Sequence, residues 1–315
     1  MGNGRFDSAA YASYSTSTTR LFDKSTNSYR DRTVSETFVN RTIDPYLNPR
    51  DISVRESCDS DANPLSTPII IGLDVTGSMG DIALKFARES IGNLMNRIYE
   101  KRPVTDPHLM FMGIGDAWCD RAPLQVSQFE ADVRIAEQLI KLYVEGGGGG
   151  NNSESYTLPW FFASRFCKID SFAKRGKKGY LFTIGDECAP EPLTKRQIVS
   201  IMGDRPEFAE ITELSGEQLY KEASKEWEIF HVLVEQGDYC RHSKTRAVKS
   251  WYNLVGNRLL RLDNKNNLEE VILAAIRIAE GMDPAEVLEK ADPAARTSIK
   301  HALFDAGEYS NPVAA

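Results

Sequence analysis

The apolar positions of this chain change their spacing repeatedly between residues 68 and 281. Apolar residues recur every three or four positions at Leu84, Ala87, Ile91, Leu94 and Ile98, as on one face of a helix. Continuous apolar runs, which are typical of strands buried on both faces of a parallel sheet, occupy residues 69–73, 109–114, 180–184, 229–234 and 259–262. Strands that alternate with helices predict an α/β fold with a doubly wound, mostly parallel open sheet. A shorter run at 124–126 predicts one antiparallel strand at its edge.

The two ends of the chain lack this pattern. Residues 1–66 contain 18 Ser and Thr but only 12 Ile, Leu, Val, Phe, Met and Trp, which predicts an extended arm that cannot form a core by itself. Residues 282–315 predict short helices and a tail. We therefore expect an N-terminal arm over 1–66, one α/β domain over 67–281 and a C-terminal segment over 282–315.

Composition excludes several classes of protein. The chain has 315 residues, of which 41% are hydrophobic and 26% charged, as in ordinary soluble domains. Its net charge of −7 opposes binding to nucleic acid or to an anionic membrane surface. No run of 18 apolar residues and no apolar leader is present, and the five cysteines form no C-x-x-C pair, so we expect reduced thiols and a cytoplasmic location.

Oxygen-bearing side chains follow the predicted strands. Because the carboxyl ends of parallel strands meet at one edge of a sheet, side chains placed just after them are expected to lie together. Carboxylates and hydroxyls without His or Cys favour a hard cation, Mg²⁺ or Mn²⁺, over zinc. The candidates after the three central strands and after the glycine run 146–150 are Asp74, Thr76, Ser78, Asp116, Asp120, Asn151, Ser153 and Asp186.

The segment Asp74-Val75-Thr76-Gly77-Ser78 resembles the Asp-x-Ser/Thr-x-Ser signature of von Willebrand factor A (vWA) domains, known as the metal-ion-dependent adhesion site. Gly149-Gly150-Asn151 with Glu154 resembles the second loop of that family, although Asn151 stands where Thr or Asp is usual. Ile184-Gly185-Asp186 resembles its Thr-Asp-Gly segment, with the order of Gly and Asp changed. The resemblance covers roughly residues 68–281.

This resemblance implies a Rossmann-like vWA fold with Mg²⁺ or Mn²⁺ held at the strand ends. The implied ligands are Asp74, Thr76, Ser78, Asn151 and Asp186. The sequence leaves open which of Asn151, Asn152 and Ser153 supplies the third contact. Asp116, Asp120 and Ser153 are expected either to surround the ligands or to line the surface that faces a partner.

The resemblance also implies a binding module and not an enzyme. In bacterial and viral cytoplasmic relatives, an Asp or Glu of a protein partner completes the coordination of the cation, and these relatives commonly act as adaptors or assembly factors beside AAA+ ATPases of the MoxR type. Two alternatives stay open. One is a metal-dependent phosphoester hydrolase that uses Asp74, Asp116 and Asp186, and the other is a structural subunit that assembles with its own copies through residues 1–66.

Overall fold

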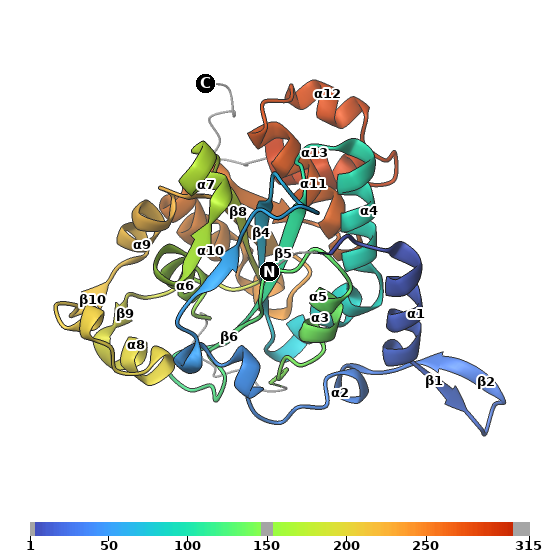
Figure 1. The fold of residues 1–315 in the computed structure, drawn as a ribbon, viewed down its shortest axis with the longest axis horizontal. Coiled ribbons are helices and arrows are strands. Elements are labelled where there is room, and N and C mark those ends of the chain that lie inside the picture. Colours follow the sequence, from blue (N-terminus) through green and yellow to red (C-terminus); the bar gives the residue numbers. More distant parts are fainter. Residues whose placement is uncertain (1–3, 146–153, 305–315) are drawn as a thin grey trace.

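The computed structural model describes residues 4–145 and 154–304, and its centre is a six-stranded mixed sheet (Figure 1). Five strands are parallel, and only the short edge strand β6 is antiparallel to its neighbour β5. The strands, in their order across the sheet, are β12 (Leu259–Leu262), β11 (Trp227–Val234), β8 (Gly179–Gly185), β4 (Thr67–Asp74), β5 (Pro107–Ile114) and β6 (Leu124–Val126). The predicted fold class, including the antiparallel edge strand, is confirmed.

The order of the strands creates a switch point between β4 and β8. From β4 the chain continues to β5 and β6 on one side, and it later returns to β8 and proceeds to β11 and β12 on the other side. The loops that follow β4 and β8 therefore leave in opposite directions. In open α/β sheets, the crevice formed at such a point is where ligands bind.

Helices cover both faces of the sheet because both faces are apolar. Strand β4 is buried along its whole length, and its alternate residues join two separate cores: Ile69 and Ile71 join one, and Ile70 joins the other. The first core is covered by α1 (Ser8–Thr19), α3 (Gly80–Lys85), α4 (Ile91–Lys101), α5 (Arg134–Leu139), α11 (Leu268–Ala279), α12 (Pro284–Glu289) and α13 (Arg296–Phe304). The second is covered by α6 (Leu158–Phe166), α7 (Asp170–Arg175), α8 (Lys195–Met202), α9 (Gly216–Ala223) and α10 (Asp238–Val255).

Smaller elements complete the described part of the chain. They are the hairpin β1 (Arg20–Asp23) and β2 (Ser28–Asp31), the single turn α2 (Val34–Thr37), the parallel pair β3 (Arg55–Ser57) and β7 (Cys167–Ile169), and the antiparallel pair β9 (Leu193–Thr194) and β10 (Glu213–Leu214). All five cysteines are free thiols. None of the helices in the described ranges combines the length and the apolar character needed to cross a lipid bilayer.

The N-terminal residues differ from the extended arm expected for them, because Ser8–Thr19 is a helix that packs beside α4 (Figure 1). Asp7 caps this helix by accepting hydrogen bonds from the backbone amides of its first turn. The ring of Tyr11 lies over Gly92 of α4, so closely that a Cβ at Gly92 would be 2.5 Å from the ring. The division of the chain at residue 66 stays a prediction.

A π-helical turn, Phe86–Ser90, explains why α1 binds at this place. A π turn interrupts the regular hydrogen bonds of an α-helix, and buried carbonyls then need other donors. The Tyr11 hydroxyl donates to the carbonyls of Phe86 (3.1 Å) and Ala87 (3.2 Å), and the Ser15 hydroxyl donates to that of Arg88 (2.6 Å). Hydroxyl groups of this segment thus donate hydrogen bonds to backbone carbonyls of the domain.

Replacing Tyr11 by Phe tests this docking, because it removes the donor and keeps the ring. We expect Tyr11→Phe to lower the free energy of unfolding by about 1–2 kcal/mol, since two buried carbonyls lose a partner. Tyr14→Phe on the same helix is the matched control, because no described residue accepts a hydrogen bond from the Tyr14 hydroxyl. Urea unfolding of both variants measures the difference, and equal stabilities would contradict the docking.

Candidate functional site

The site begins where β4 ends. Asp74 is the last residue of β4, and Thr76 lies two positions further, so the two side chains fall on the same side of an extended backbone while Val75 between them enters the core. Gly77 has a φ of +44°, which turns the chain toward α3 at a conformation that residues with a Cβ rarely adopt. Ser78 lies in the turn Gly77–Met79 that follows.

Both carboxylate oxygens of Asp74 are held by hydrogen bonds, although its side chain is almost completely buried. Oδ1 accepts from the backbone N–H of Thr76 at 2.9 Å and from its hydroxyl at 2.7 Å. Oδ2 accepts from the hydroxyl of Tyr156 at 2.8 Å. The Thr76 hydroxyl also lies 3.2 Å from Oε1 of Glu154, so it joins two carboxylates.

Tyr156 reaches Asp74 because its surroundings leave no other place for its ring. The rings of His231 and Trp251 contact it edge-on at centroid distances of 5.1 and 5.6 Å. Its hydroxyl lies where a Cβ of residue 185 would be, only 2.1 Å away, so the position after Ile184 must be a glycine. The need for glycine at position 185 is therefore structural: Gly185 leaves room for Tyr156, which orients Asp74.

Several buried carboxylates surround Asp74 and repel one another. Burial raises the pKa of Asp74, and the negative charge of Asp186 adds to this, while the hydrogen bonds from Thr76 and Tyr156 oppose it. Burial and the charges of neighbouring carboxylates, Asp74 first among them, also raise the pKa of Glu154. The same two causes raise the pKa of Glu187 to about 7. Such a group of acids attracts protons or a cation.

Asp186, which follows β8, interacts with a helix. Its Oδ2 accepts a hydrogen bond from the backbone N–H of Tyr239 at 2.9 Å, in the first turn of α10. The carboxylate lies so close to Gly237 that a Cβ there would be within 2.3 Å of Oδ2. Asp186 is thus 5% exposed and placed at the switch point, with one of its oxygens engaged by the helix N-terminus.

Asp116 and Asp120 lie in the loop that follows β5, and their carboxylates accept hydrogen bonds from within this loop. Asp116 accepts hydrogen bonds from the backbone N–H of Trp118 (3.0 Å) and from the thiol of Cys119 (3.0 Å), and Asp120 accepts from the backbone N–H of Asp116 (2.7 Å). Burial, with the help of Asp116, raises the pKa of the Cys119 thiol to about 12, so this cysteine stays protonated at neutral pH. Asp116 is 1% exposed, and the loop is fixed beside it because the Ser155 hydroxyl accepts from the backbone N–H of Ala117 at 2.9 Å.

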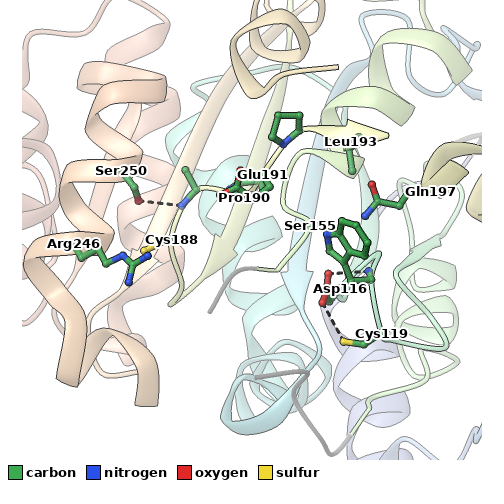
Figure 2. Close-up of a pocket in the computed structure, with 13 residues that line it drawn as sticks. Asp116, Cys119, Ser155, Cys188, Pro190, Glu191, Leu193, Gln197, Arg246 and Ser250 are labelled. Carbon is green, nitrogen blue, oxygen red and sulfur yellow. Dashed lines mark hydrogen bonds between the residues drawn. The ribbon is translucent and has the colours of Figure 1, made fainter. Parts of the chain in front are cut away.

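A groove of about 520 Å³ opens beside these residues (Figure 2). Asp116 and Cys119 lie on one side of it, and Arg246 and Ser250 of α10 lie on the other. The segment after β8 forms part of its wall and is fixed there, because the Ser250 hydroxyl accepts from the backbone N–H of Ala189 at 3.0 Å. Trp118, also in its lining, has 70% of its surface exposed.

The structure places five of the proposed residues at one edge of the sheet, and Ser78 in the turn after Thr76. Asp74, Thr76, Asp116, Asp120 and Asp186 all lie at the carboxyl edge of the sheet. The predictions for Asn151, Asn152 and Ser153 fall outside the described residues. Three residues of the site were absent from the predicted ligand set: Glu154, Glu187 and Tyr156.

Two of these three had a signal in the sequence. Glu154 belongs to the loop on which the resemblance rests, and Glu187 directly follows Asp186.

Within the described ranges, no three His, Cys, Asp or Glu side chains are grouped closely enough to hold a metal ion by themselves. A cation at this edge would therefore need hydroxyl donors such as that of Thr76 in addition to carboxylates.

Comparisons with known proteins give similarity in structure only. No protein-family model and no curated protein matches the sequence. Among solved structures, the pilus adhesin SpaC from Lactobacillus rhamnosus GG in its open conformation aligns with 72% of this chain at 9% identity and a TM-score of 0.44, and the chain covers 31% of SpaC. The vWF domain of the type V pili tip protein Mfa5 from Porphyromonas gingivalis aligns with 74% of this chain at 12% identity and a TM-score of 0.37, over 98% of that domain.

The raised pKa values predict how stability depends on pH when no divalent cation is present. A carboxyl group whose pKa is higher in the folded than in the unfolded protein keeps its proton on folding, so its stabilising effect is present at low pH and is lost as the pH rises through the folded value. For Glu187 that value is about 7, and the pKa of Asp74 is shifted in the same direction. In chelator, the free energy of unfolding should therefore fall between roughly pH 4 and pH 7.

Asp74→Asn tests the origin of this dependence. It removes one negative charge from the group at constant volume, so at pH 8 the variant should be more stable than the original protein by at least about 1 kcal/mol, with little difference near pH 4. The control is Glu210→Gln, which removes an exposed carboxylate elsewhere. Urea unfolding at both pH values measures the effect. A variant that is less stable at pH 8 would show that the Asp74 charge is compensated within the protein.

Proposed function

We propose that this chain is a protein-interaction module of the vWA type that holds Mg²⁺ or Mn²⁺ at the switch point of its sheet. The proposed ligands are Asp74, Thr76 and Ser78 after β4, a side chain among residues 151–153, and Asp186 after β8. A carboxylate of a protein partner completes the coordination of the cation.

The observation that carries this proposal is a buried negative charge without a compensating positive one. Asp74 is 1% exposed, and in the described part of the chain no Lys, Arg or His forms an ion pair with Asp74, Asp186 or Glu187. Oε2 of Glu187 is buried without a hydrogen-bond donor among those residues. Burying ionised groups in this way is costly unless a cation balances them. The oxygen-only donor set fits a hard cation.

The mixture of acids and hydroxyls supports an open coordination position. Thr76 and Ser78 are neutral donors, so they leave more of the positive charge of the cation uncompensated than carboxylates in their places would. A cation held in this way attracts a further anionic ligand, and an Asp or Glu of a partner offers one. Thr76 already joins Asp74 to Glu154, which keeps its hydroxyl at the position where the motif requires a donor.

The surface beside the site is suited to a protein partner. Trp118 is a large apolar side chain that lies in the lining of the groove with 70% of its surface exposed. Tryptophan is enriched among the residues that contribute most to binding at protein interfaces. We therefore propose that the partner contacts Trp118 while its acidic residue reaches the cation. An AAA+ ATPase of the MoxR type is the first candidate for this partner, on the resemblance alone.

The cation is tested by titration. Mn²⁺ should bind the purified full chain at a single site, and Asp74→Asn should weaken it by at least about a hundredfold, because a charge-assisted ligand is lost. Thr76→Asp should strengthen it by adding an anionic ligand. Glu210→Gln serves as the control and should leave it unchanged. Equal Mn²⁺ affinity in Asp74→Asn and in the original protein would refute the site.

The open position is tested with the same Thr76→Asp variant. It should capture less of the partner from a lysate of the source cells even though it binds the cation more tightly, because the second carboxylate lowers the charge left for an external ligand. Trp118→Ala should reduce capture as well, without any change in Mn²⁺ affinity. Undiminished capture by Thr76→Asp would mean that the cation does not contact the partner.

The hydrolase alternative predicts a different result. A phosphoesterase would release phosphate from a generic phosphomonoester in the presence of Mg²⁺, and Asp74→Asn would abolish this activity. In the described structure His231 stacks on Trp251 behind Tyr156 and is completely buried, and burial lowers its pKa far below the usual range, so it is not placed to act as a base. Magnesium-dependent turnover that Asp74→Asn removes would replace the binding proposal.

A further inference from the structure

A separate cavity of about 260 Å³ lies between α4, α11, α12 and α13. Figure 1 shows these four helices grouped together. The cavity is lined by apolar residues such as Leu273 and Ile299 and by several basic side chains, namely Arg97, Lys101, Arg277 and Lys290. None of these residues belongs to the proposed cation site.

Arg277 is the unusual member of this group. It lies in the last turn of α11 and is only 5% exposed, yet no carboxylate of the described residues forms an ion pair with it. Its Nε is buried and has no hydrogen-bond partner among those residues. A mostly buried guanidinium without an ion pair is unfavourable, so an anion that reaches Arg277 through the cavity would stabilise it.

The acidic residues of the cavity do not supply that anion, because they are engaged by another arginine. Arg97 lies 2.5 Å from Glu270 and 3.6 Å from Asp292, and these two carboxylates balance its charge. Glu270 is partly buried, and its carboxylate faces Arg97, so it is already engaged on that side of the cavity. The positive charge of Arg277 is therefore not balanced by either of these two carboxylates.

Two lysines at the rim of the cavity are available to join Arg277. Within the described ranges, Lys101 and Lys290 pair only with Glu100 and Glu286, which are close to them in the sequence, and such exposed pairs contribute little to stability. Both ammonium groups can therefore turn toward an anion in the cavity. One guanidinium and two ammonium groups match the several oxygens and the double charge of a phosphate group.

We infer that this cavity binds a small molecule that carries a phosphate group, with Arg277 as its main contact. The guanidinium of Arg277 donates to the phosphate oxygens, and Lys101 and Lys290 contribute charge from the rim. The volume is close to the lower end of the range for small-molecule sites, which begins at about 300 Å³, so the ligand is small. This site is independent of the proposed cation site and of its partner.

Inorganic phosphate and pyrophosphate are the probes for this site. Titration calorimetry in chelator and at low ionic strength should show that pyrophosphate binds the full chain with a dissociation constant of about 1 mM or lower. Arg277→Met keeps the apolar stem of the side chain and should weaken binding by at least about tenfold. Arg165→Met is the matched control, because Arg165 is a partly buried arginine paired with Glu222 elsewhere in the protein, and it should leave binding unchanged.

The outcome is decided even if Arg277→Met does not fold. Methyl NMR of the original protein should then show pyrophosphate-induced shifts at Leu273, Val287 and Ile299, which line the cavity. Shifts at these methyl groups, or the loss of binding in Arg277→Met, support the inference. Absence of binding, equal binding by Arg277→Met, or shifts confined to other regions would overturn it.

Discussion

One carboxylate that is removed from water connects the elements around the central strand. Asp74 ends β4 in the interior, and its two oxygens are satisfied by Thr76 and Tyr156. The hydrogen bond from Tyr156 depends on residues that are distant from Asp74 in the sequence. Tyr156 needs the empty space at Gly185, and its ring needs the edge contacts of His231 and Trp251 from β11 and α10. Elements from both sides of the switch point thereby meet around a single side chain.

The fold could be predicted from the sequence because its sheet is buried on both faces. Strands in that position must be continuously apolar, so their runs stand out from the stripes of the helices, as Ile69–Leu73 does against Leu84 and Leu94. The candidate site followed from the same pattern, because side chains that follow parallel strands converge whatever their distance in the sequence. Asp74, Asp116 and Asp186 were found by this rule alone.

Other features could not be predicted because they depend on contacts between distant segments. The bond from Tyr156 to Asp74 spans 82 positions and depends on the space above Gly185. The serines and tyrosines of α1 gave no sign of a docked helix, because their acceptors are carbonyls that become free only where α4 is preceded by a π turn. A composition rich in hydroxyls is typical of disordered segments, and it equally suits a helix whose task is to donate hydrogen bonds.

The contact between Asp186 and the first turn of α10 has a mechanical consequence. The same helix that this carboxylate holds at Tyr239 carries Arg246 and Ser250, which form the far wall of the groove in Figure 2. Because a Cβ at Gly237 would collide with the carboxylate, the first turn of α10 lies directly against Asp186. Between Tyr239 and Arg246 the helix is kinked at Ser243, whose φ of −134° and ψ of 26° are not helical, so the far wall of the groove can change its angle while the first turn stays bound to the acidic edge.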